Sequence, residues 1–101
     1  MAITSSPADG GKVLTIKVQG RFDFSCHQDF RRSYESAGKQ TERYEVDLAD
    51  TTYLDSSALG MLLLLRDYAG GDGSRIRISN CNADVKKILT ISNFEQLFAI
   101  G

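Results

Sequence analysis

The chain has 101 residues, of which 42% are hydrophobic and 25% are charged, so it can form one hydrophobic core but not two. Its 12 Lys and Arg residues against 13 Asp and Glu residues give a formal net charge of -1. This balance excludes the basic field that draws proteins to nucleic acid or to an anionic membrane surface. We therefore expect protein partners, with no direct nucleic-acid binding and no membrane binding.

Targeting and metal signals are also absent from the sequence pattern. The longest apolar run, Met61 to Leu65, is far shorter than the roughly 20 residues that span a bilayer. The segment Met1 to Pro7 lacks the charged and apolar pattern of a signal peptide. Cys26 and Cys81 lie far apart, with no Cys or His at metal-ligand spacing. These features predict a cytoplasmic protein with two free thiols, no metal site and no cofactor.

The predicted elements begin after a flexible leader. Residues 1–11 contain Pro7, Gly10 and Gly11, so we expect a loose N-terminal segment followed by one domain over residues 12–101. Apolar residues then alternate in a strand pattern that Gly20 ends, with three inward-facing side chains: Leu14, Ile16 and Val18.

A first helix and a second strand follow. Ser25 and Gln28 have the spacing of a capping box, with Ser25 as the N-cap. Helical spacing connects Cys26, Phe30, Tyr34 and Ala37. The second strand alternates charged residues with the apolar residues Tyr44, Val46 and Leu48, and a turn over residues 50–55 leads onward.

The next helix is rich in leucine and ends at Gly70-Gly71-Asp72-Gly73. At about 100° per residue, its core-facing stripe consists of Ala58, Leu62, Leu65 and Ala69, with Leu59 and Met61 at the edges. The opposite side collects Ser56, Gly60, Leu63 and Asp67, with Leu64 at its margin. We expect Leu63 to point away from the core, where Gly60 lets another chain approach.

The last third of the chain repeats the alternation of strand and helix. Ile76 and Ile78 indicate a strand, and Asn82 caps a helix that Asn93 ends in the left-handed conformation. Apolar residues of this part are Val85, Ile88 and Leu89 in the helix, and Leu97, Phe98 and Ile100 in a short final strand. Strands alternating with helices predict a single α/β domain, a small mixed β-sheet with flanking α-helices.

The most informative segment is Asp55-Ser56-Ser57, which begins the leucine-rich helix. Asp and Ser are common N-caps, and the free amides of a first helical turn favour a negative group, so a serine here could hold a phosphate. The chemistry of this segment alone is that of an ordinary cap. With Ser56 at a capping position, its replacement by Ala is expected to cost roughly 0.5 to 2 kcal/mol.

Two motifs together carry a family resemblance. Asp55-Ser56-Ser57-Ala58-Leu59-Gly60 resembles the D-S-[ST]-G-L-G signature of STAS domains, the anti-sigma factor antagonists, and Gly20-Arg21-Phe22-Asp23 resembles the second family motif, G-x-[hydrophobic]-D. The resemblance extends from Lys12 to Ile100. The chain departs from the family pattern at Ala58 and Asn93, where glycine is usual.

This resemblance implies a partner switch with no catalysis of its own. A serine kinase would phosphorylate Ser56, and a phosphatase would remove the phosphate. The unphosphorylated form would bind an anti-sigma factor and thereby release a sigma factor for transcription. When the residues that helix geometry places on the outer side of the leucine-rich helix are added to those of the two motifs, the predicted partner-binding residues are Asp23, Asp55, Ser57, Gly60, Leu63, Leu64 and Asp67.

Two alternatives compete with that interpretation. An enzyme with Ser56 or Ser57 as nucleophile is disfavoured, because the only histidine, His27, belongs to another segment and the G-x-S-x-G elbow is missing. A STAS-type module in which Ser56 phosphorylation regulates another signalling enzyme or a sensor complex fits the same residues. The sequence does not separate this second alternative from the sigma-factor switch.

Overall fold

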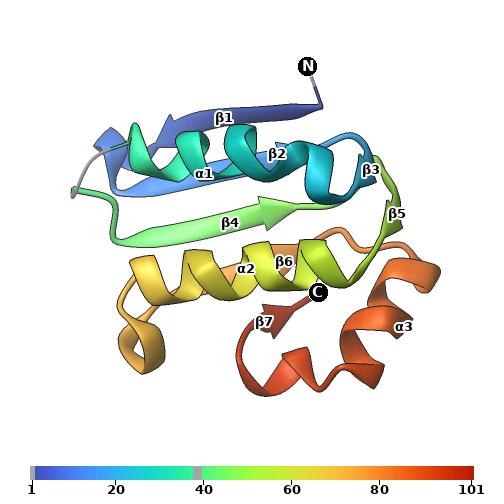
Figure 1. Ribbon diagram of the computed structural model, residues 1–101. Helices are drawn as coiled ribbons and strands as arrows, with labels where there is room; N and C mark the ends of the chain where they lie inside the picture. The colour runs from blue at the N-terminus through green and yellow to red at the C-terminus, as the bar shows by residue number, and fades with distance from the viewer. Residues whose placement is uncertain (1, 38–39) are drawn as a thin grey trace.

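The computed structural model describes residues 2–37 and 40–101, which fold into an α/β domain around a mixed sheet (Figure 1). The main sheet has the strand order β1-β2-β4-β6-β7. Its strands are β1 (Ile3–Ala8), β2 (Val13–Val18), β4 (Arg43–Asp47), β6 (Ile76–Ser79) and β7 (Ala99–Ile100). Strand β1 pairs antiparallel with β2, and the other pairs are parallel. The predicted fold class, a small mixed sheet with flanking helices, is confirmed.

The longer helices are α1 (His27–Glu35), α2 (Ser56–Tyr68) and α3 (Ala83–Ile91). Short 3₁₀ turns occupy Asp9–Gly11, Phe24–Cys26, Gly71–Gly73 and Phe94–Gln96. Helices α1 and α2 lie next to each other over one face of the sheet, whereas α3 packs by strand β5 (Thr51–Leu54) (Figure 1). Among residues 2–37 and 40–101, no helix is both long enough and apolar enough to cross a bilayer.

The core lies between the sheet and these helices. Alternate residues of a strand point to opposite faces, so each inner strand contributes every second side chain. The buried strand residues are Leu14, Ile16 and Val18 of β2, Tyr44 and Val46 of β4, and Ile76 and Ile78 of β6. They meet helix residues that include Phe30, Leu62, Leu65 and Leu89, each no more than 1% exposed. The opposite face of the strands carries charged side chains.

The expected flexible leader over residues 1–11 is wrong for most of its length. Residues Ile3–Ala8 form β1, whose register with β2 runs from Ile3 opposite Val18 to Ala8 opposite Val13. Ile3 is buried and anchors the strand. Pro7 is tolerated because an edge strand leaves amides unpaired, and Gly10 and Gly11 adopt positive φ in the connection to β2. Met1 lies outside the described residues.

A second, two-stranded sheet was not predicted. Strand β3 (Gly20–Phe22) pairs in parallel with β5, which occupies the segment expected to be a turn. Strand β2 ends at Val18, just before Gly20 as predicted, and Gly20 begins the next strand. Its φ of 78° turns the chain into β3, and its amide donates to the Asp50 carbonyl at 2.9 Å. The buried Thr51 hydroxyl donates to the Val18 carbonyl at 2.9 Å and joins the two sheets.

The predicted helix ends are confirmed in three places and corrected in one. Asn82 caps α3 by accepting from the Val85 amide, Asn93 has φ 61°, and Gly70 has φ 116° after α2. The capping box at Ser25 is wrong, because the Ser25 amide is itself a donor to the Asp23 side chain. Helix α1 begins two residues later, at His27, without a side-chain cap. Leu97 and Phe98 precede β7 and are not part of it.

Candidate functional site

Two aspartates meet at the carboxyl ends of β3 and β5. The register places Phe22 beside Leu54, so the residues that follow, Asp23 and Asp55, occupy neighbouring positions. Both aspartates have extended backbone conformations, and both accept an amide hydrogen bond from the turn that begins after them. The small parallel sheet therefore brings the two sequence motifs together, as expected for Asp23 and Asp55.

Asp55 is the N-cap of α2. Its Oδ1 accepts from the Ser57 hydroxyl at 2.6 Å and from the Ala58 amide at 3.1 Å. These two hydrogen bonds lower the pKa of Asp55 below its ordinary value, and the bond from Ser57 has the larger effect. The nearby Asp23 carboxylate opposes the shift. The Ser57 hydroxyl is thus committed to the cap, and Asp55 stays ionised near neutral pH.

Asp23 has a similar but not identical set of hydrogen bonds one strand away. Its Oδ1 accepts from the Ser25 hydroxyl at 2.5 Å and from the Ser25 amide at 3.0 Å, and both bonds lower its pKa. The Arg21 Nε lies 3.4 Å from Asp23 Oδ2. The site therefore holds two Asp-x-Ser turns, Asp23 with Ser25 and Asp55 with Ser57, which share the bond from the serine hydroxyl and differ in the amide that donates to the aspartate.

Ser56 differs from its neighbours because it is exposed at the first position of α2. In the described part of the chain, its hydroxyl takes part in no side-chain hydrogen bond within the protein. This position corrects one expectation: Asp55 is the cap, so replacing Ser56 by Ala removes no capping bond and costs less than the 0.5 to 2 kcal/mol expected. Ser56 is accessible to a modifying enzyme.

The rotation of α2 about its axis agrees with the predicted stripe. Ala58, Leu62 and Leu65 are fully buried, whereas Leu63 is 39% and Leu64 49% exposed. Gly60 and Asp67 are exposed as well. A methyl group added at Gly60 would meet no heavy atom within 4 Å, so the surface there is open. The orientation of the helix is confirmed, and the docking role of this face stays a prediction.

Sequence reasoning missed an aromatic rim beside the two aspartates. Phe24 is 70% exposed and stacks on His27, with ring centroids 5.4 Å apart. Tyr53 is 43% exposed, and the Arg21 guanidinium lies 4.4 Å from its ring centroid. The sequence did contain a signal for Phe24. It lies two residues before Cys26, so it falls outside the helical spacing of buried residues that begins there. The pairing of Arg21 with Tyr53 required knowledge of the β3–β5 register.

Comparison with solved structures shows the same fold. A putative anti-sigma factor antagonist from Thermotoga maritima matches with a TM-score of 0.83 and 16% identity, covering 97% of this chain and 84% of that one. The anti-sigma factor antagonist SpoIIAA in its unphosphorylated form matches with a TM-score of 0.83 and 16% identity, covering 99% and 88%. The phosphorylated form of the Bacillus determinant SpoIIAA matches with a TM-score of 0.68 and 13% identity, covering 99% and 91%.

Comparison with known sequences gives a relative of much higher identity and a family match. A STAS-domain containing protein from Pseudomonas aeruginosa strain UCBPP-PA14 is 62% identical over 101 residues, which are 100% of this chain and 100% of that protein. The family model described as "Mlab, STAS domain" matches residues 6–99. This match includes both Asp-x-Ser turns and all three long helices. The chain therefore belongs to the STAS domain family.

Proposed function

We propose that the chain is an anti-sigma factor antagonist in a phosphorylation-controlled partner switch. The unphosphorylated form binds an anti-sigma factor and releases a sigma factor for transcription. A serine kinase switches binding off by phosphorylating Ser56, and a phosphatase restores it. The observation that carries the proposal is the exposed Ser56 at the start of α2, next to a face where Leu63 and Leu64 are also exposed.

The switch acts through charge. A phosphoserine carries roughly -1.5 to -2 charges near neutral pH. At Ser56 this charge is stabilised by the amides and dipole of the helix N-terminus, and it adds to the two ionised carboxylates of Asp23 and Asp55. A partner surface that fits the unphosphorylated site then meets a concentrated negative charge. An acidic partner surface is repelled, and no rearrangement of the fold is needed.

The docking surface combines the switch with apolar contacts. Leu63 and Leu64 supply apolar area on α2, Gly60 permits close approach, and Asp67 marks the far end of the face. Leu64 also lies at the junction between α2 and α1, close to Phe30 and Met61. Asp23, Asp55 and Ser57 frame Ser56, and the exposed Phe24 extends the apolar rim.

The same geometry supports a binding role without catalysis. A nucleophilic serine needs a base that accepts its proton. The Ser57 hydroxyl donates to Asp55 within a helix cap, and the single histidine, His27, stacks on Phe24. Neither serine is hydrogen-bonded to His27 in residues 2–37 and 40–101.

A pull-down from the source bacterium tests the proposal. Tagged wild type, Ser56→Ala and Ser56→Asp are used as baits, and captured proteins are identified by mass spectrometry. We expect wild type and Ser56→Ala to capture an anti-sigma factor, and Ser56→Asp to capture much less of it. Recovery of a different signalling enzyme or a sensor complex, with the same dependence on Ser56, would keep the switch and replace the partner. Equal capture by all three baits would exclude the switch.

A matched control separates charge at Ser56 from charge on the same helix. Asp67 lies on the predicted docking face but three turns from the N-terminus of α2, so Asp67→Asn changes the charge of that face without changing the phosphorylation site. Its effect on capture should be smaller than that of Ser56→Asp. Circular dichroism of every bait establishes that all are folded.

A further inference from the structure

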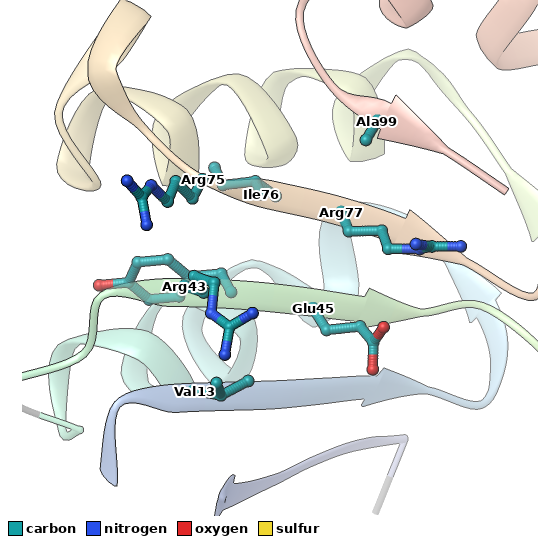
Figure 2. Close-up of a pocket in the computed structure, with 8 residues that line it drawn as sticks. Val13, Arg43, Glu45, Arg75, Ile76, Arg77 and Ala99 are labelled. Atoms are coloured by element: carbon teal, nitrogen blue, oxygen red, sulfur yellow. The ribbon is translucent and has the colours of Figure 1, made fainter. Parts of the chain in front are cut away.

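The second face of the main sheet is not covered by α1 or α2. Parallel sheets usually have both faces covered, so an open face on β2, β4 and β6 is unusual. A hollow of about 330 Å³ lies on this face, and Figure 2 draws the residues that line it. Its lining residues are Val13, Arg43, Tyr44, Glu45, Arg75, Ile76, Arg77 and Ala99. The list includes none of the residues placed at the phosphorylation site.

The hollow has a charge opposite to that of the whole molecule. Three arginines and one glutamate line it, an excess of two positive charges in a chain whose formal net charge is -1. Arg75 and Arg77 are exposed and form no ion pair with any residue that the structure describes. Arg43 lies 3.8 Å from Asp9, but both side chains are more than half exposed, so this pair is weak.

The strand register places one unlike pair and one like pair of charges side by side on this face. Glu45 is opposite Arg77, and the Tyr44 amide donates to the Arg75 carbonyl at 2.9 Å. Tyr44 pairs with Ile76, so the residues that precede them, Arg43 and Arg75, lie next to each other. Like charges at adjacent cross-strand positions are unfavourable, and an anion bound beside them removes that repulsion.

The arrangement of the side chains fits an extended ligand better than a compact one. In Figure 2 the guanidinium groups of Arg75, Arg43 and Arg77 spread along the hollow and do not converge on one point. The Glu45 carboxylate reaches into the same region and would repel a compact anion such as a phosphate. Alternate residues of a strand are about 6.4 to 6.8 Å apart, which is also the spacing of alternate side chains in an extended peptide.

We propose that this arginine face, defined by Arg43, Arg75 and Arg77, is a second docking surface that binds an extended acidic segment of a partner protein. Carboxylates at alternate positions of the segment pair with the arginines, and Val13 and Ala99 contact its backbone and small side chains. The surface lies on the face of the sheet opposite α2. Binding there is therefore compatible with either state of Ser56, and the proposal does not depend on the identity of the switch partner.

Fluorescence anisotropy with the full chain tests the arginine face. The probe is a fluorescein-labelled peptide of alternating Glu and Ser, and the reference probe is the matching peptide of Lys and Ser, both at low ionic strength. We expect the acidic peptide alone to bind. Arg75→Ala combined with Arg77→Ala should raise its Kd by about tenfold, since two exposed charge pairs are lost. Amide shifts in ¹⁵N NMR spectra should then map to β4 and β6.

A matched double variant on another surface provides the control. Arg31→Ala combined with Arg32→Ala removes the same charge from α1, and it should leave the Kd unchanged. Ser56→Asp should leave it unchanged too. An equal loss of peptide affinity in the α1 control would show that the peptide is attracted nonspecifically. A loss of peptide affinity in Ser56→Asp would show that the arginine face and the Ser56 site are not separate. Either result overturns the proposal.

Two further measurements test whether a compact anion or a second copy of the chain binds the arginine face instead. Displacement of the acidic peptide by an equal concentration of tripolyphosphate would assign the arginine face to a compact anion. Sedimentation that shows self-association of wild type, lost in Arg75→Ala with Arg77→Ala, would assign it to a second copy of the chain. Both results contradict an acidic partner segment. The acidic partner segment is supported if tripolyphosphate does not displace the peptide and the wild-type chain sediments as a monomer.

Discussion

Three consecutive residues at the start of α2 have three different tasks. Asp55 caps the helix, Ser57 donates its hydroxyl to that cap, and Ser56 between them faces solvent. Phosphorylation of Ser57 would remove the bond that its hydroxyl donates to Asp55, whereas phosphorylation of Ser56 leaves both bonds to Asp55 intact. The hydrogen bonds thus distinguish two serines that are identical in chemistry and adjacent in sequence.

Phosphopeptide mapping after treatment with the native kinase should place one phosphate on Ser56. Ser57 is half-buried, and Thr51 is only 1% exposed with its hydroxyl bonded to Val18. Ser56→Ala should abolish the modification and change the free energy of unfolding by less than about 0.5 kcal/mol, because it removes no capping bond. Phosphate found on Ser57, Thr51 or Thr52 would show that the wrong residue is assigned.

The two capping carboxylates make stability depend on pH in the acid range. The pKa of Asp55 is lowered from its ordinary value of 3.8 by the bonds from Ser57 and Ala58, so ionisation favours the fold. This contribution is present above pH 3.8 and is lost as the pH falls through 3.8 toward the lower folded-state pKa.

Asp55→Asn should therefore reduce the acid sensitivity of the fold. Asn keeps a capping oxygen but does not titrate, so its thermal midpoint should fall less than that of wild type between about pH 5 and pH 3. Thermal melts across this range measure the difference. Parallel pH profiles for the two proteins would mean that Asp55 does not contribute in this way.

At the scale of one element, α2 joins the core to the predicted docking face. Leu62 and Leu63 are neighbours in sequence, but Leu62 is fully buried and Leu63 is 39% exposed. Leu62→Glu should unfold the domain, because a buried and unpaired carboxylate is strongly unfavourable. Leu63→Glu should keep the thermal midpoint nearly unchanged and abolish partner binding. Thermal melts and a binding titration of both variants check the pair, and a folded Leu63→Glu with full binding would remove Leu63 from the docking face.

The turn between β3 and α1 makes a separate prediction. Phe24 is 70% exposed beside the Asp23 carboxylate, and exposed aromatic residues at the centre of an interface often dominate its affinity. Phe24→Ala should weaken partner binding by about tenfold or more with little change in stability. Ile91→Ala is the matched control, because Ile91 on α3 is equally exposed at 71%. An equal effect of both substitutions would indicate that general surface hydrophobicity, and not the position of Phe24, determines binding.

Across the whole molecule, sequence periodicity was sufficient to predict the helices and strands that are long or have clear caps. It located β2, β4, β6 and the core face of α2, since burial on one face imposes a regular spacing. It failed at β1, β3 and β5. Ile3 is the only large apolar residue in β1, and β3 has three residues, so neither has a periodic signal, and their pairing depends on contacts with distant strands.

The same limit applies to the site. Local capping rules predicted a helix start at Asp55-Ser56-Ser57 but not which of the three residues is the cap, and both the choice of Ser56 and the placement of Asp23 beside it came from the family resemblance. The register of β3 with β5 explains that placement physically. The arginine face could not be predicted, because Arg43 comes from β4 whereas Arg75 and Arg77 come from the segment of β6, and only the sheet brings them together.

The central claim is that phosphate on Ser56 controls partner binding, and a calorimetric titration tests it most directly. The partner recovered in the pull-down is titrated with the unphosphorylated chain and with the same chain stoichiometrically phosphorylated on Ser56. Phosphorylation should raise the Kd at least about tenfold, since a dianion is placed within the docking surface, while the melting curve shows a folded domain. Equal affinity of the two forms, with mass spectrometry confirming the phosphate on Ser56, would show that this phosphate does not control partner binding.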